Sequence, residues 1–114
     1  MKKEIEVQVK ADREVLALTG KLLQTQDIES RYRIFLETLG KRTADQVPLC
    51  FYCNEADGSV MMILFELKSA GFLQYQQFSA EQVARRSDGF AVGGITYAGR
   101  IELARLIREK EARE

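Results

Sequence analysis

Two stretches decide how this chain should fold: VMMILFELKSAGF at residues 60–72 and ITYAGRIELARLI at residues 95–107. Both repeat apolar residues at the three- and four-residue spacing of a helix. Between them, FLQYQQF at 72–78 alternates as a strand does, SAEQVARRSDG at 79–89 is polar, and FAVGGIT at 90–96 is again strand-like. The sequence therefore predicts, in order, a helix, a strand, a polar loop, a second strand and a final helix.

The residues between these segments have the chemistry of caps and turns. A helix starting near Asp57 or Ser59 should end at Gly71, because glycine readily adopts the left-handed conformation that terminates helices. Asp88-Gly89 is a strong turn signal before the second strand, and Thr96 can cap the last helix. These signals support the predicted boundaries.

The N-terminal part starts with EIEVQVK at residues 4–10, whose strict alternation predicts a half-exposed strand, although seven residues can also begin a helix. Asp12 can cap a helix over residues 13–25. The apolar face of that helix is wide enough to need cover on more than one side. Leu16 and Leu23 extend this face sideways, so we expect them to form the interface of a homodimer.

A second helix is predicted over residues 28–40, opened by Asp27 or Ser30 and closed by Gly40. The aromatic segment LCFYC at 49–53 is strand-like. With the later elements, the expected fold class is α+β, with a small antiparallel sheet. Its helices lie near 13–25, 28–40, 58–70 and 97–112, and its strands near 49–53, 72–78 and 90–96.

Two motifs carry a resemblance to known proteins. LKSAGFL at 67–73 resembles the Leu-x-x-Ala-Gly-apolar end of a recognition helix, and ITYAGRIEL at 95–103 resembles the apolar-Thr-x-x-Gly-x-x-x-Leu entry to a C-terminal helix. Together they resemble winged helix-turn-helix proteins, distantly the MarR-like and PadR-like regulators. The resemblance is greatest to a small, uncharacterised family of bacterial and prophage proteins with LKEAGLI and ITWxGHEFL-like phrases. It implies a winged-helix domain at 28–114 behind an N-terminal extension at 1–27.

Composition limits the function. The 114 residues suit one domain, and 46% hydrophobic and 30% charged residues are ordinary for a soluble globular protein. No apolar run approaches the roughly 20 residues of a membrane span, and the N-terminus lacks the apolar stretch of a signal peptide, so a cytoplasmic protein without membrane association is expected. The chain has no histidine, which excludes histidine-based catalysis, and we find no nucleophile-and-base arrangement or phosphate loop. A non-enzymatic protein without cofactors is expected.

Two binding functions remain open. Lys plus Arg and Asp plus Glu both number 17, so no overall field attracts DNA, and binding would need a local patch. The resemblance favours a DNA-binding transcription regulator, with double-stranded DNA as the partner. The candidate contacts are two arginines of the wing, two basic residues between the expected helix-turn-helix helices and two polar residues of the recognition helix: Arg85, Arg86, Lys41, Arg42, Ser59 and Lys68.

The composition of the recognition helix favours the alternative. A helix that reads bases should display Arg, Lys, Asn, Gln or Ser, yet residues 58–70 offer only Ser59, Glu66, Lys68 and Ser69 besides apolar residues. The alternative is a protein-interaction module, such as a phage accessory factor or an inhibitor of a host complex. In either case, apolar residues of this helix, including Met61, Met62 and Phe65, are expected in the core, although methionines also occur at partner-binding grooves.

Cys50 and Cys53 have the spacing of a redox pair or of half a zinc site. One chain supplies only two ligands, so zinc would have to be shared across a dimer. Because the pair lies in an apolar, aromatic segment, two buried free thiols are favoured, with no metal bound. On the last helix, Tyr97, Ile101, Ala104 and Ile107 share an apolar face.

Overall fold

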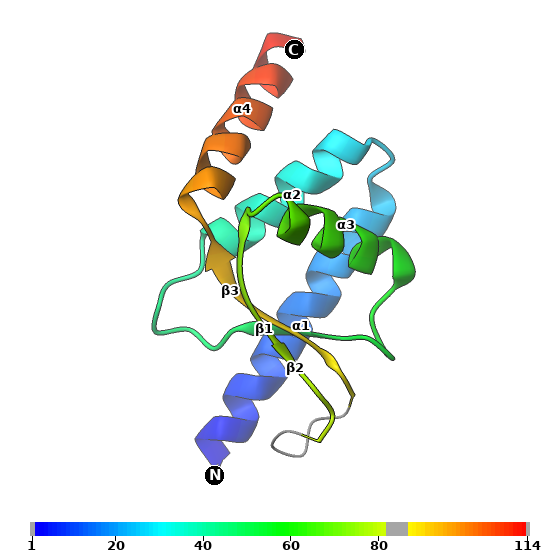
Figure 1. Ribbon diagram of the computed structural model, residues 1–114, viewed down its shortest axis with the longest axis vertical. Helices are drawn as coiled ribbons and strands as arrows, with labels where there is room; N and C mark the ends of the chain where they lie inside the picture. The colour runs from blue at the N-terminus through cyan, green and yellow to red at the C-terminus, as the bar shows by residue number, and fades with distance from the viewer. Residues whose placement is uncertain (1, 82–86, 114) are drawn as a thin grey trace.

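The computed structural model describes residues 2–81 and 87–113, which form four helices and a three-stranded antiparallel sheet (Figure 1). The elements are α1 (Lys2–Gln24), α2 (Ile28–Gly40), β1 (Leu49–Tyr52), α3 (Gly58–Ser69), β2 (Leu73–Phe78), β3 (Gly89–Ile95) and α4 (Tyr97–Arg113). The predicted α+β class is confirmed, and six predicted elements agree with the structure to within one residue at each end.

The N-terminal prediction is wrong in one respect. Residues 4–10 form no strand but are part of α1, which continues through residues 13–24 without a break. Lys, Glu, Gln and Ala predominate among residues 2–13, and all four are good helix formers. No proline or glycine precedes Gly20, so a helix packed through its second half can extend back to Lys2.

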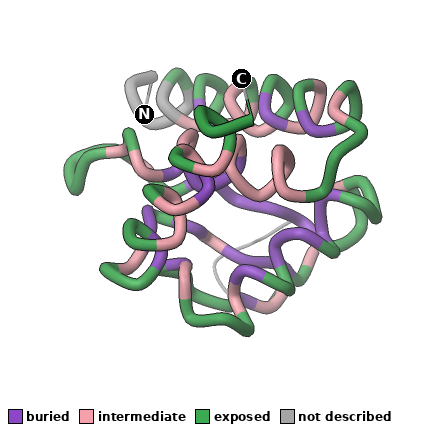
Figure 2. The backbone as a smooth tube through the Cα atoms, turned by 90° about the horizontal axis from the view of Figure 1, so that it is seen from above, coloured by how far each residue is buried: buried purple, intermediate pink, exposed green. Residues whose placement is uncertain are grey.

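The main core lies between the helices and one face of the sheet, where the buried stretches of the backbone converge (Figure 2). Phe35 of α2 stacks on Phe51 of β1 with their ring centroids 5.7 Å apart. From α1, Leu18 and Leu22 enter the same core. The N-terminal helix is thus packed on the rest of the chain by apolar burial, the main stabilising force in folding.

The sheet has the strand order β1-β3-β2, with β3 in the centre. Phe51 pairs with Phe90 on one side of β3, and Phe78 pairs with Gly89 on the other. A Cβ atom at Gly89 would lie 2.3 Å from the carbonyl oxygen of Phe51, so this position requires glycine for steric reasons. The opposite face holds a small cluster in which Tyr52 meets Phe78 edge to face, with centroids 5.5 Å apart.

The C-terminal end of α3 is closed by a glycine cap. Gly71 has a φ of +81°, and its N–H donates to the carbonyl of Lys68 at 3.0 Å. The N–H of Phe72 donates to the carbonyl of Leu67, also at 3.0 Å. These two bonds form the Schellman motif, which explains the Leu-Lys-Ser-Ala-Gly-Phe sequence and confirms the predicted stop at Gly71.

The two sequence motifs contact each other in the fold. Thr96 caps α4 by accepting from the N–H of Gly99 at 3.1 Å, and its hydroxyl donates to the carbonyl of Gly71 at 2.6 Å. The Thr96 N–H donates to the carbonyl of Phe72 at 2.9 Å. A Cβ atom at Gly99 would lie 2.4 Å from that same carbonyl oxygen. The motifs therefore dock α4 onto the end of α3.

This docking sets the rotation of α4 about its axis. Leu106 is buried and Leu103 packs against the core, whereas Tyr97 and Ile101 are largely exposed. The face predicted from Tyr97, Ile101, Ala104 and Ile107 is therefore not the main core contact. The close approach at Gly99 turns a neighbouring side of the helix inward.

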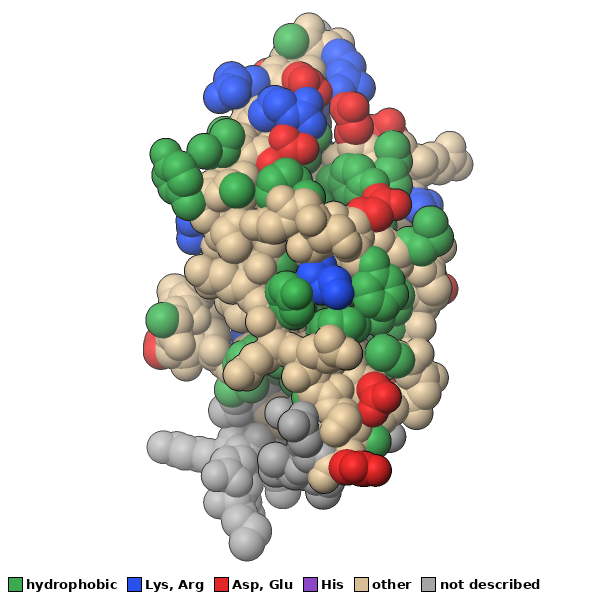
Figure 3. All heavy atoms as spheres, viewed as in Figure 1, with side chains coloured by type: hydrophobic (Ala, Val, Ile, Leu, Met, Phe, Trp, Pro, Cys, Tyr) green, Lys and Arg blue, Asp and Glu red, His purple; other side chains and the backbone are tan. Residues whose placement is uncertain are grey.

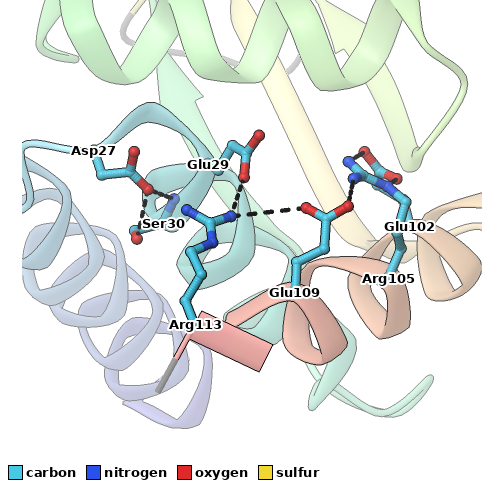
Figure 4. A network of polar contacts seen from close by, with 7 residues as sticks. All are labelled: Asp27, Glu29, Ser30, Glu102, Arg105, Glu109 and Arg113. Atoms are coloured by element: carbon cyan, nitrogen blue, oxygen red, sulfur yellow. Dashed lines mark hydrogen bonds and ion pairs between the residues drawn. The ribbon is translucent and has the colours of Figure 1, made fainter. Parts of the chain in front are cut away.

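An ion pair joins the far end of α4 to the start of α2 (Figure 4): Arg113 pairs with Glu29 at 2.7 Å. Within α4, Arg105 pairs with Glu102 at 2.6 Å. Hydrogen bonding to Arg105 lowers the pKa of Glu102. Asp27 caps α2 by accepting from the N–H and the hydroxyl of Ser30 at 3.0 and 2.9 Å, and these bonds lower the pKa of Asp27.

Within residues 2–81 and 87–113, no helix combines the length and the apolar character needed to cross a bilayer.

Candidate functional site

The predicted wing residues, Arg85 and Arg86, lie outside the described residues. In the sequence they fall between β2 and β3. After the end of β2 the N–H of Ala80 donates to the carboxylate of Asp88 at 2.8 Å, and the N–H of Cys53 donates to the Asp88 carbonyl at 2.9 Å. Asp88 therefore links the end of β2 and the start of β3 to the turn that follows β1.

The two basic residues after α2 have different surroundings. Lys41 is exposed, but the side chain of Arg42 is buried, where its guanidinium pairs with Glu14 of α1 and donates to the carbonyl of Val47. Arg42 thereby ties α1 to the segment between α2 and β1. This burial argues against the predicted phosphate contact of Arg42 and leaves Lys41 as the accessible member of the pair.

Helices α2 and α3 do not follow one another as a helix-turn-helix pair. Residues 41–57 separate them and contain β1, so no tight turn joins these two helices. Ser59 is exposed at the start of α3, where its N–H donates to the carboxylate of the capping residue Asp57 at 2.8 Å. The predicted recognition helix is therefore preceded in the chain by β1 and a turn rather than directly by another helix.

The exposed side of α3 carries apolar side chains, whereas the exposed side of a helix that contacts DNA bases would carry polar ones. Met62 and Phe65 are 63% and 41% exposed, so the prediction that they belong to the core is wrong, whereas Met61 is buried as predicted. Glu66 is also exposed on this helix. The outward side of α3 thus presents large apolar side chains and a carboxylate.

These side chains continue onto the sheet as an aromatic face, defined as Met62, Phe65, Lys68, Tyr75 and Phe90. Phe90 meets Phe65 and Tyr75 edge to face, with centroids 5.5 and 6.1 Å apart. The Lys68 ammonium lies 5.1 to 5.5 Å from the centroids of all three rings. Figure 3 shows a basic side chain among hydrophobic ones on this side of the molecule.

Cation–π attraction holds Lys68 over this face, because the ammonium lies within about 6 Å of each ring. Lys68 was predicted as a DNA contact. Its position instead makes it the cation at the centre of an apolar surface. Such a surface suits an apolar side chain with an acidic neighbour better than it suits a row of phosphates.

The two cysteines differ in exposure. Cys50 is buried, as predicted, whereas Cys53 is exposed, which corrects the prediction of two buried thiols. Both are free of disulfide bonds. In the described part of the chain no three Cys, Asp or Glu residues are grouped to hold a metal ion.

A second apolar surface lies on α1. The predicted dimer residues Leu16 and Leu23 are both exposed and line a groove of about 560 Å³ between α1 and β1. The remaining lining residues are Asp12, Val15, Thr19, Cys50, Phe51, Tyr52, Glu55, Ala56 and Asp57. The groove has an apolar floor and an acidic rim.

Sequence reasoning missed the aromatic face, although a signal for it was present. Met62 and Phe65 have the i, i+3 spacing of a second apolar stripe beside the buried stripe that contains Val60 and Ile63. A helix with two apolar stripes covers more than one surface. Only the packing of α3 on the sheet shows which stripe is outside.

Comparison of the chain with protein-family models, curated proteins and solved structures finds no match.

Proposed function

We propose that this chain is a non-enzymatic protein-interaction module of winged-helix type that binds a protein partner through the aromatic face. The order α2, β1, α3, β2, β3, with β2 and β3 as a hairpin, supports the winged-helix description. The observation that carries the function is the exposure of Met62, Phe65 and Tyr75 around Lys68. Exposed aromatic clusters with polar surroundings are typical of protein interfaces.

The chemistry of the face specifies the partner. Aromatic and methionine side chains are enriched at the centres of interfaces, where a few of them supply most of the binding energy. The Lys68 ammonium adds a positive charge, which favours a carboxylate at the edge of the apolar contact. The expected ligand is therefore a peptide segment with an apolar or aromatic anchor beside Asp or Glu.

Panning a random peptide library against the protein tests this proposal. Selected peptides should contain apolar anchors beside acidic residues. Replacing Met62 and Phe65 by serine should weaken their binding by roughly thirtyfold or more, since removing a central anchor costs about 2 kcal/mol. The matched control replaces Tyr97 and Ile101, which are exposed on α4, by serine and should retain binding.

DNA binding is the second candidate function, supported by the sequence position of Arg85 and Arg86 between β2 and β3, where the wing of a winged-helix protein would contact phosphates. Fluorescence anisotropy with random duplex DNA at low and high salt separates the two functions. Two results together would reverse the order of the two proposals. DNA binding would be salt-sensitive and lost when both arginines are replaced by alanine, and peptide affinity would be unchanged when Met62 and Phe65 are replaced by serine.

A further inference from the structure

The outer side of α1 carries a seam of exposed apolar residues, defined as Val9, Leu16 and Leu23. Their side chains are 42%, 70% and 49% exposed. They are spaced by seven residues, which is nearly two helical turns, so they lie in one line. The buried residues Leu18 and Leu22 face the core from another side of the same helix. The apolar residues of the seam therefore remain exposed to solvent after the chain has folded.

The two flanks of this seam differ in charge. On one flank are Asp12 and the groove between α1 and β1, whose rim also holds Glu55 and Asp57. None of the described residues that line the groove is Lys or Arg. By the 100° rotation per residue of a helix, exposed Arg13, Glu6 and Lys10 follow the seam on the other flank, which therefore carries a net positive charge.

The N-terminal half of α1 extends past the core. Among residues of this helix whose side chains are described, Ala11 is the first to be buried. A helical segment with so few tertiary contacts is marginal in water on its own. A surface that covers the seam would stabilise it.

We propose that the seam packs against the seam of a second copy, with the two α1 helices parallel about a two-fold axis that runs along them. This arrangement places each seam residue beside its own copy and brings opposite flanks together. Asp12 of one chain then lies close to Arg13 of the other, and the basic flank of each helix covers the acidic groove of its partner. An antiparallel pair would instead bring like flanks together.

Sedimentation equilibrium at tens of micromolar tests the assembly. The wild-type protein should sediment at twice its chain mass of 13.0 kDa. Replacing Leu16 and Leu23 by glutamate should raise the dissociation constant roughly a hundredfold or more. The control with glutamate at Tyr97 and Ile101 of α4 should remain dimeric. A monomeric wild type, or a dimer unaffected by the α1 substitutions, would overturn the proposal.

Cross-linking tests the parallel orientation and needs no destabilised variant. With Cys53→Ser as background, Val9→Cys should form an intermolecular disulfide on mild oxidation, because Val9 lies beside its own copy only in the parallel arrangement. A matched background protein without the Val9 substitution should not cross-link. Failure of the Val9 variant to cross-link, in a protein that sediments as a dimer, would reject the parallel pair.

The charge pairing provides an independent measurement. Asp12→Arg alone and Arg13→Asp alone should each weaken the dimer by about tenfold, whereas the combined exchange should restore it. If the combined variant were as weak as the single variants, Asp12 and Arg13 would not face each other across the axis.

Discussion

Replacing Arg42 by alanine should destabilise the protein even though Arg42 belongs to a loop next to an exposed lysine. The side chain of Arg42 is only 8% exposed, whereas that of its partner Glu14 is 34% exposed. The guanidinium also donates to the carbonyl of Val47. The substitution therefore removes two charge-assisted contacts that connect α1 with the segment preceding β1.

The size of the effect follows from this geometry. Loss of one partner of a fully buried ion pair costs about 3–5 kcal/mol. Glu14 is partly solvated and can regain water, and Nε of Arg42 is buried without a hydrogen-bond partner among the described residues, so part of this cost is absent. Alanine also loses none of the about 2 kcal/mol of side-chain conformational entropy that fixing an arginine costs on folding. We expect a net loss of about 2 kcal/mol.

Urea denaturation followed by circular dichroism measures this loss. In thermal denaturation the same loss of stability should lower the Tm by roughly 5–10 °C for a chain of this size. Lys41→Ala is the matched control, because Lys41 is the exposed neighbour of Arg42 and its loss should change stability by less than about 0.5 kcal/mol. Equal stabilities of the two variants would refute the structural role of Arg42 and return it to the candidate DNA contacts.

Three further outcomes are expected. Gly99→Ala should lower the Tm, because a Cβ there would lie 2.4 Å from a backbone carbonyl oxygen; an unchanged Tm would contradict the close packing of α4. Asp27→Ala should lower the Tm at pH 7 and lower it by less in acid: Ser30 lowers the Asp27 pKa in the folded state, so the stabilisation is complete above about pH 4 and is lost as the pH falls through the lowered pKa. A difference in Tm that stays constant as the pH falls would rule out the carboxylate as its cause. Cys53 should react with a thiol reagent in the native protein, whereas Cys50 should react only on unfolding, as mass spectrometry of the labelled peptides would show.

Local signals in the sequence were sufficient for most of the secondary structure. Asp27, Asp57 and Gly71 mark helix ends because capping depends on hydrogen bonds within a few residues of the same chain. The strand prediction at residues 4–10 failed because the local pattern there was not sufficient. Alternation over seven residues cannot decide between strand and helix, and the extension of α1 depends on its own packed second half.

The candidate sites depended on tertiary structure. Nothing local distinguishes Lys41 from Arg42, or Met61 from Met62, because exposure is decided by the elements that pack against them. The pairing of Arg42 with Glu14 joins residues far apart in the chain, and the aromatic face requires α3, β2 and β3 together. The sequence by itself thus determined the chemistry of the side chains and the local caps. The tertiary structure decided which of those side chains face solvent, since burial is a property of the assembled core rather than of any single segment.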